Sequence, residues 1–333
     1  MTIGYGVIGL GFFGAKHAEV AAQLPGVELR AVCTRNDARR REVKRQLQVP
    51  RDYARYEDLL ADPAIDAVSV VTHVDDHLAP TVAALEAGKH VLLEKPMART
   101  PAECTRMIAA AERTGRILMI GHICRFNPRY AVARERIRAG ELGKIVSLYA
   151  RRNIPAARSK TVLEKIDPLL GDGIHDTDLM LWMTGARIVS AYAQTLSVRK
   201  LKNPDLGWAM YRFDSGAIGV IEDVWFLPEG TPFRIHEHME VIGTEGSLYI
   251  HGGDMNLSVQ TKRGVDCPDT LYWPEMHGEV VGALRNEMSY FIDCVGRGKQ
   301  PEVVRPEEAM RAVRAVNAAI QSARKGSVVK IRS

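Results

Sequence analysis

The chain has 333 residues, of which 46% are hydrophobic and 26% charged, as in a folded globular protein rather than a disordered one. Its 45 basic and 40 acidic residues contain no long basic run, which argues against a nucleic-acid-binding protein. The five cysteines have no C-x-x-C spacing, and no apolar run approaches the ~20 residues of a membrane span. We expect about two domains, reduced thiols, no disulfide framework, no signal peptide and a cytoplasmic protein.

A glycine-rich turn follows the first predicted strand, which begins near Ile3, and precedes a helix predicted over residues 15–24. In this context, the first glycine of a G-x-G-x-x-G pattern allows a tight turn and the second lets a pyrophosphate approach. The third glycine allows close packing of helix and strand. The free N–H groups at the start of the helix favour an anion. The residues assigned to this dinucleotide contact are Gly9, Gly11, Phe12, Phe13 and Gly14.

The second predicted strand, residues 27–33, ends where the adenosine ribose of a dinucleotide is read. An acidic residue there would accept the ribose hydroxyls of NAD, but this chain has Thr34, Arg35 and Asn36. A cationic Arg35 suits a 2′-phosphate, so the pattern slightly favours NADP over NAD. The alternative is that Asp37 binds the ribose and Arg35 is a surface residue.

Strands and helices alternate up to residue 121, which predicts an α/β Rossmann domain with a doubly wound parallel sheet over 1–121. The further strands are predicted at 67–71, 90–93 and 117–121, and the helices at 39–47, 56–60, 78–87 and 101–113. Ligands bind at the carboxyl ends of such strands. The residues assigned to the cofactor there are Thr72, His77, Glu94 and Lys95.

The rhythm changes after His122, and longer alternating strands predict a second α/β domain over 122–333 with a large, mostly antiparallel open sheet. These strands are expected at 145–151, 189–198, 208–213, 217–225, 238–242, 247–251, 257–261 and 327–331. One helix, 172–183, interrupts them, and others are expected at 128–139, 280–295 and 306–324. Helices on one face would leave the other face uncovered, so we expect a homodimer or homotetramer.

Four motifs, in this order, carry a resemblance to a known family. They are Glu94-Lys95-Pro96, the segment from Gly121 to Pro128, the segment from Gly173 to Asp178, and Gly243-Thr244-Glu245-Gly246-Ser247-Leu248. Together they resemble the Gfo/Idh/MocA family of NAD(P)-dependent sugar and polyol oxidoreductases. The resemblance implies a Rossmann domain followed by an open-sheet domain, with the nicotinamide between them. It also implies that Lys95 and His175 are catalytic and that the Lys95–Pro96 bond is cis.

The residues themselves agree with these roles. Lys95 follows a strand at its carboxyl end, where a lysine can orient a hydroxyl group. A carboxylate near His175 would fix its tautomer and suit it to act as a general base. The family's aspartate usually stands four residues before this histidine, where the present chain has Gly171. Asp172, assigned here to the active site, or Asp176 is then the partner of His175.

The resemblance implies a secondary alcohol or ketone of a sugar, inositol or related polyol as substrate. The residues assigned to substrate binding are Lys95, Arg125, Asn153, Asp172 and His175. Arginines such as Arg152 and Arg158 suit anionic groups, so a nucleotide-sugar dehydrogenase or ketoreductase is an alternative. A regulator that binds NAD(P) without turnover is a second alternative. His236 and His238 share a strand face without a third ligand at a telling spacing, so we expect no metal site. Because no long apolar run is present, we also expect no membrane partner.

Overall fold

The computed structural model describes residues 2–252 and 257–331. A parallel sheet forms the centre of the N-terminal part of the chain. Its strands lie in the order β3-β2-β1-β4-β5-β6, the order of a Rossmann fold. The bounds are β1 Ile3–Ile8, β2 Val27–Cys33, β3 Arg51–Tyr53, β4 Ala67–Val70, β5 His90–Glu94 and β6 Leu118–Gly121. Every residue of β1, β4 and β6 is buried, as expected for parallel strands with helices on both faces. The predicted doubly wound sheet is confirmed.

The helices of this sheet begin and end at ordinary capping signals. Their bounds are α1 Phe12–Gln23, α2 Asp37–Leu47, α3 Tyr56–Leu60, α4 Leu78–Glu86 and α5 Pro101–Thr114. The side chain of Asn36 caps α2 by accepting from the Arg39 N–H at 3.0 Å. Thr100 and Glu103 form a capping box at α5, and Gly115 ends that helix at φ 65°.

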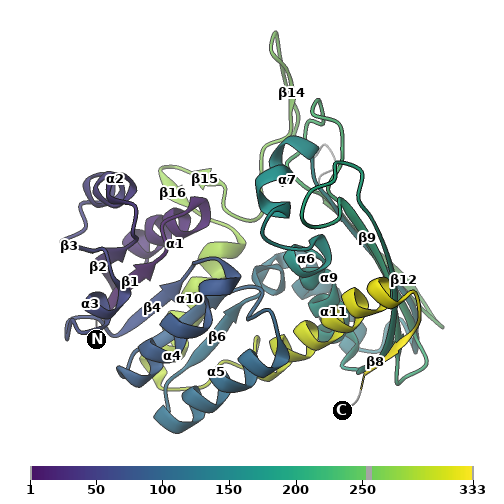
Figure 1. The fold of residues 1–333 in the computed structure, drawn as a ribbon, viewed down its shortest axis with the longest axis horizontal. Coiled ribbons are helices and arrows are strands. Elements are labelled where there is room, and N and C mark those ends of the chain that lie inside the picture. Colours follow the sequence, from purple (N-terminus) through teal and green to yellow (C-terminus); the bar gives the residue numbers. More distant parts are fainter. Residues whose placement is uncertain (1, 253–256, 332–333) are drawn as a thin grey trace. The chain divides into compact units, whose positions relative to one another are not determined.

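The structure divides the chain into two units, and their limits differ from the single boundary predicted after residue 121. One unit contains the chain up to Asn127 together with Leu271–Met310, and the other contains Pro128–Thr270 and the chain from Arg311 onward (Figure 1). The later segment of the first unit carries α10, Ala283–Arg297. Its Phe291 packs edge-on against Tyr5 of β1, with the ring centroids 6.5 Å apart. The first unit is therefore built from two separate stretches of sequence.

The second unit is built on a seven-stranded sheet in the order β12-β11-β7-β10-β9-β8-β17. β10 runs parallel to β7, and the other neighbours are antiparallel, so the mostly antiparallel sheet is confirmed. The bounds are β7 Ile145–Asn153, β8 Ile188–Leu196, β9 Leu206–Phe213, β10 Ile218–Val224, β11 His236–Gly243, β12 Ser247–Gly252 and β17 Val329–Lys330. Short hairpins follow, β13 Val259–Thr261 with β14 Gly264–Asp266, and, in the first unit, β15 Glu275–Met276 with β16 Glu279–Val280.

The helices of the second unit include two that the sequence did not predict. Their bounds are α6 Pro128–Arg138, α7 Ala156–Leu163, α8 Pro168–Gly171 and α9 Gly173–Thr184, and the C-terminal helix α11 runs from Pro306 to Lys325. The prediction of a single helix among the strands is therefore wrong. α8 is only four residues long, and α7 has just two buried residues, so neither shows a clear helical stripe in the sequence.

The two faces of this sheet differ in exposure because successive side chains of a strand alternate between them. Inward-facing residues such as Tyr211 and Ile221 are buried, whereas Trp208 is 43% and Met210 49% exposed on the other face. Tyr249 of β12 is 54% exposed. We call the apolar side chains on this side, Trp208, Met210, Ile218 and Tyr249, the open sheet face.

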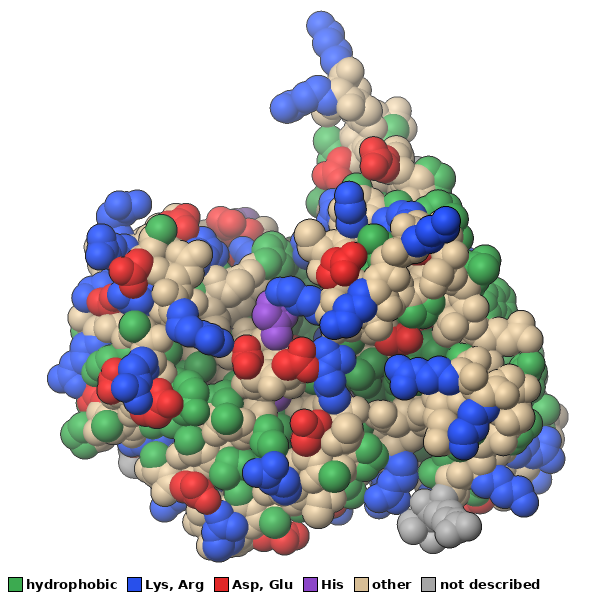
Figure 2. Space-filling view, in the orientation of Figure 1, with side chains coloured by type: hydrophobic (Ala, Val, Ile, Leu, Met, Phe, Trp, Pro, Cys, Tyr) green, Lys and Arg blue, Asp and Glu red, His purple; other side chains and the backbone are tan. Residues whose placement is uncertain are grey.

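The charged residues do not gather into a single patch on the face shown in Figure 2, where basic and acidic side chains are intermixed. Among the helices of the described residues, none has the length and apolarity needed to span a membrane.

Candidate active site

The glycine turn of the first unit has the geometry that its sequence predicts. Gly9 lies at φ 95°, and a Cβ there would be 2.4 Å from the Val71 carbonyl oxygen. A Cβ on Gly14 would be 1.9 Å from the Gly9 carbonyl oxygen, so only glycine allows α1 to pack this closely. At Gly11, by contrast, the described residues leave open space within 4 Å of the Cβ position. The turn therefore has room for a ligand at its middle glycine.

The start of α1 is suited to a phosphate group. Gly11 is the N-cap and supplies no side-chain cap, and the first turn contains no acidic residue. The first N–H groups of this 12-residue helix thus face outward with the positive end of the helix dipole. Phe12 is 52% exposed, and the ring of Phe13 lies 5.2 Å from that of Trp273. These features fit the pyrophosphate of a dinucleotide.

The end of β2 presents an arginine rather than an acid. The side chain of Arg35 is 88% exposed, and its guanidinium lies 3.4 Å from Asp76. The Asp37 carboxylate is paired with Arg40 at 2.5 Å, so it is already engaged within the protein. The Thr34 hydroxyl accepts from the Asn36 N–H at 3.5 Å. The Arg35 side chain is more accessible than that of Asp37, which is 62% exposed.

The loop after β4 contains Thr72 and His77, which both bind the backbone of this unit. The Thr72 hydroxyl donates to the Asp76 carbonyl at 3.0 Å. The buried His77 ring lies with Nδ1 3.0 Å from the Pro96 carbonyl oxygen and Nε2 3.1 Å from that of Thr72. Burial lowers the pKa of His77. Its ring therefore lies between carbonyl oxygens of the loops that follow β4 and β5, and in the neutral form it donates to one of them, a placement that the sequence did not indicate.

Glu94 and Lys95 stand at the carboxyl end of β5. The Lys95–Pro96 peptide bond is cis, as the resemblance implied. Lys95 is half-buried, whereas the Glu94 carboxylate is buried inside the unit. One of its oxygens lies 3.2 Å from Nε2 of His17, and the other accepts from the Lys95 N–H at 3.1 Å. The Glu94 side chain is thus held by the protein, although we had assigned it to the cofactor.

In the second unit, His175 lies in the first turn of α9 and is 6% exposed. The backbone N–H of His175 donates to the backbone carbonyl of Asp172 at 2.9 Å. Asp172 is the N-cap residue, with φ −123° and ψ −32°, and the helix begins directly after it. Asp172 therefore precedes the helix that carries His175.

Asp176 of α9 belongs to a buried ion cluster that this helix forms with residues of β7 and β11. Arg152 of β7 binds both of its carboxylate oxygens, at 3.1 and 2.9 Å, and also reaches Glu237 of β11 at 2.9 Å. Burial raises the pKa of Asp176, while Arg152 opposes the increase. This pairing engages the Asp176 carboxylate, which leaves Asp172 as the better candidate partner of His175.

Asp223 of β10 was not predicted, yet it lies against the same helix. It is fully buried, and neither carboxylate oxygen has a hydrogen-bond partner among residues 2–252 and 257–331. A Cβ at Gly173, the first residue of α9, would be 2.4 Å from its Oδ2 atom. Burial, followed by the charges of Asp176 and Asp172, raises the pKa of Asp223 well above its usual value. Strand alternation places residue 223 inward, but its contact with α9 could not be read from sequence.

The remaining substrate candidates differ in accessibility. Arg125 is 2% exposed and donates to the Val303 carbonyl at 2.6 Å and to Glu308 at 2.5 Å, which ties the two segments of the first unit together. Asn153 is 5% exposed and bonds Glu222 and the Val224 N–H. Arg158 is exposed.

The histidines of β11 lie on the open side of the sheet. His236 Nε2 is 2.9 Å from Arg151, and His238 and His251 approach through their Nδ1 atoms at 3.0 Å. In the described part of the chain, no group of three or more His, Cys, Asp or Glu side chains is arranged to hold a metal ion.

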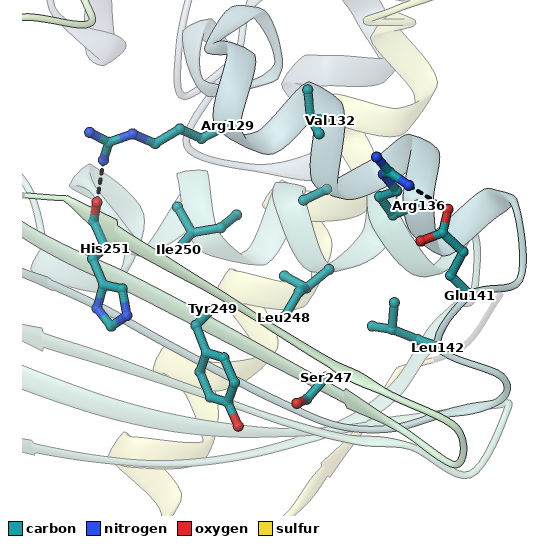
Figure 3. Close-up of a pocket in the computed structure, with 11 residues that line it drawn as sticks. Arg129, Val132, Arg136, Glu141, Leu142, Ser247, Leu248, Tyr249, Ile250 and His251 are labelled. Carbon is teal, nitrogen blue, oxygen red and sulfur yellow. Dashed lines mark hydrogen bonds and ion pairs between the residues drawn. The ribbon is translucent and has the colours of Figure 1, made fainter.

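A surface pocket of about 580 Å³ lies between α6 and β12 (Figure 3). Arg129 spans it to the His251 carbonyl, and Arg136 pairs with Glu141 at 2.9 Å. It contains none of the residues assigned above to cofactor or substrate.

Comparison with known proteins places the chain in a family. Residues 3–122 match the model of an oxidoreductase family with an NAD-binding Rossmann fold, and residues 130–249 match the Gfo/Idh/MocA C-terminal domain. The scyllo-inositol 2-dehydrogenase (NAD(+)) of Bacillus subtilis is 31% identical over 89% of this chain and 87% of its own. The chain belongs to the Gfo/Idh/MocA family. The predicted family and fold class are thereby confirmed.

Two further relatives match over nearly the full length. A D-xylose 1-dehydrogenase (NADP(+)) of Haloferax volcanii is 27% identical over 98% of this chain and 99% of its own. The crystal structure of myo-inositol 2-dehydrogenase from Lactobacillus plantarum superposes with a TM-score of 0.87 at 26% identity, covering 100% of both chains.

Proposed function

We propose that this protein is an NAD(P)-dependent dehydrogenase that acts on a secondary alcohol, or the corresponding ketone, of an inositol, sugar or related polyol. The observation that carries the proposal is the 31% identity to an inositol dehydrogenase over 89% of the chain. The glycine turn and the open start of α1 support the cofactor.

We assign the proton chemistry to three residues. A bound oxidised nicotinamide would supply the acceptor for the hydride that leaves the carbinol carbon. Lys95 donates a hydrogen bond to the reacting oxygen, and His175 takes the hydroxyl proton as general base. Asp172, at the N-cap just before α9, is assigned to orient His175. The resemblance supplies these roles, and the placement of Lys95 at the end of β5 supports them.

The proton chemistry is tested with Lys95→Met and His175→Ala, assayed by nicotinamide absorbance with inositols, aldoses and UDP-sugars. We expect each variant to lose at least about 100-fold in kcat while retaining cofactor affinity, since general acid–base groups contribute about 10²–10⁴-fold. Lys299→Met, at an exposed position of the first unit, is the matched control. Full turnover by both variants would refute these roles. Turnover of UDP-sugars alone would identify a nucleotide-sugar enzyme, and cofactor binding without any turnover would identify a regulator.

The arginine argument for an anionic substrate weakens once the contacts are known. The guanidinium groups of Arg125 and Arg152 both bind carboxylates inside their units. Arg158 is the exposed one of the three. We therefore place uncharged polyols ahead of nucleotide sugars.

For the cofactor we propose a preference for NADP. The support is the 88% exposed side chain of Arg35 at the end of β2, together with the pairing of Asp37 to Arg40. A planar guanidinium binds a 2′-phosphate through two parallel hydrogen bonds. Parallel titrations with NAD and NADP test this preference.

We further propose that the chain forms a homodimer or homotetramer through the open sheet face. The support is the exposure of its large apolar side chains, because such patches are uncommon on monomers. Sedimentation at micromolar concentration should show an oligomer, and Trp208→Asp combined with Met210→Asp should shift it towards monomer. Sedimentation of the unmodified protein as a monomer would refute the proposal.

A further inference from the structure

We propose that His17 is a positioning residue for Lys95, and that it acts through the carboxylate of Glu94. The inference rests on the proposed role of Lys95 in the reaction. Its consequence is that α1, the helix that begins at the glycine turn, also fixes the backbone from which Lys95 extends.

A continuous chain of hydrogen bonds connects the elements of the first unit. The Tyr5 hydroxyl of β1 lies 2.6 Å from the Ser69 hydroxyl of β4, and Ser69 lies 2.9 Å from Nδ1 of His17. Nε2 of His17 is 3.2 Å from Oε1 of Glu94, and the other oxygen of Glu94 accepts from the Lys95 N–H at 3.1 Å. Three strands and one helix thus converge on the peptide that begins Lys95.

The chemistry of the donors fixes the order of the protons. An ionised carboxylate only accepts hydrogen bonds, so His17 must carry its proton on Nε2 to bond Glu94. In the neutral ring, Nδ1 then accepts from Ser69, and Ser69 accepts from Tyr5. Tyr5, Ser69 and His17 each donate one hydrogen bond in this sequence, and Glu94 accepts the last of them, which holds the imidazole in one tautomer and one orientation.

A second buried carboxyl group, that of Glu287, interacts electrostatically with Glu94. Glu287 of α10 is fully buried, and its oxygens have no hydrogen-bond partner within the described ranges. Burial, and then the negative charge of Glu94, raise the pKa of Glu287 well above its usual value. Glu94, by contrast, meets the N–H groups of His17 and Lys95. Glu94 therefore has hydrogen-bonding neighbours that Glu287 lacks among the described residues.

The surrounding backbone leaves Glu94 little freedom. A Cβ at Gly121 of β6 would lie 2.6 Å from Oε1 of Glu94, so glycine makes room for the carboxylate. His17 and Ser69 are 0% exposed, and Glu94 is 5% exposed. On the other side of Lys95, the Pro96 carbonyl oxygen lies 3.0 Å from His77. The backbone on both sides of Lys95 is thus held by buried histidines, through Glu94 and through Pro96.

The test compares His17→Leu with His17→Gln. Leucine removes both ring nitrogens, whereas the amide nitrogen of glutamine can replace the Nε2 donor to Glu94. We expect His17→Leu to lower kcat about 10- to 100-fold, because a displaced reactive group costs rate of this order, and to leave the cofactor Kd within about twofold. Glutamine should restore most of kcat. An unchanged kcat in His17→Leu, or no recovery with glutamine, would overturn the proposal.

The same substitution in a Lys95→Met background shows whether His17 acts through the lysine. If it does, His17→Leu causes no further loss of kcat there, whereas an equal further loss contradicts the proposal. Lys95→Met alone tests the proposed function separately, since full turnover by that variant would remove the catalytic role itself.

Ser69→Ala is the second variant, for use if His17→Leu does not fold. It removes the hydroxyl that bonds both Nδ1 of His17 and Tyr5 but leaves the imidazole in place, and we expect a two- to tenfold loss of kcat with unchanged cofactor affinity. An unchanged kcat in Ser69→Ala would also overturn the proposal.

Discussion

Replacing Arg152 by methionine is expected to destabilise the second unit strongly. The buried guanidinium binds both oxygens of Asp176, at 3.1 and 2.9 Å, and Glu237 at 2.9 Å. Methionine keeps an unbranched apolar side chain but removes the charge, so two buried carboxylates lose their cation. Breaking a buried ion pair in this way costs about 3–5 kcal/mol, and we expect the free energy of unfolding to fall by this amount near neutral pH.

The loss of folding stability in Arg152→Met should increase as pH rises. Burial already raises the pKa of Asp176 above its usual 3.8, and Arg152 opposes that increase. Without Arg152 the folded-state pKa rises further, so the folded state binds a proton that the unfolded state releases. A group of this kind destabilises the fold as pH rises above its unfolded pKa, and the cost disappears below about pH 3.8. The difference between variant and unmodified protein should therefore be larger at pH 8 than at pH 5.

Urea unfolding, followed by tryptophan fluorescence at both pH values, measures this difference. Arg151→Met is the matched control, because Arg151 is half-buried and its guanidinium lies 2.9 Å from His236 on the open side of the sheet. We expect the control to lose no more than about 1 kcal/mol. Adding Asp176→Asn and Glu237→Gln to Arg152→Met should recover much of the loss.

A loss below about 1 kcal/mol for Arg152→Met, or a loss independent of pH, would refute the argument that Arg152 stabilises the two buried carboxyl groups.

Three further predictions concern single positions. The melting temperature of Asp223→Asn should exceed that of the unmodified protein by a margin that grows from pH 5 to pH 9. The reason is that the pKa of Asp223 is raised in the folded protein, so rising pH destabilises the fold through this carboxyl group. A margin that does not change with pH would contradict this. Gly14→Ala should lower both the melting temperature and the cofactor affinity, because its Cβ would lie 1.9 Å from the Gly9 carbonyl oxygen. Gly11→Ala should lower the cofactor affinity alone, because the space around its Cβ position is open. Equal melting temperatures of the two variants would contradict this. Arg35→Ala should weaken NADP about tenfold, or 1.4 kcal/mol, and NAD less than about twofold in calorimetric titrations; equal losses would argue against a 2′-phosphate contact.

The sequence predicted elements well where a local pattern decides them. β2 was predicted over residues 27–33, and it has these bounds: apolar residues alternate with Glu28 and Arg30 at its start, and turn residues stand on either side. α5 was predicted to start at Pro101, which follows the Thr100 cap. α7 was missed because its packing depends on neighbours distant in sequence, such as the Trp225 carbonyl that accepts from Ser159 at 2.8 Å.

The site was predicted less completely, for the same physical reason. The Glu94 side chain was assigned to the cofactor, but its carboxylate meets His17, which is 77 positions away in the sequence. Arg152 was considered for substrate binding, yet it is the cross-strand partner of Glu237 in the register of β7 and β11. No motif states such a register, and it follows only once the strands are paired.

The order in which the chain is synthesised has a consequence for the first unit. Residues up to Asn127 leave the ribosome long before Leu271–Met310, the segment that completes this unit. Until then, Arg125 lacks Glu308, and Tyr5 lacks Phe291. A fragment cut at residue 127 would share this deficit. Exchange of the nucleotide-binding unit between relatives would therefore require two separate inserts, one for each of these segments.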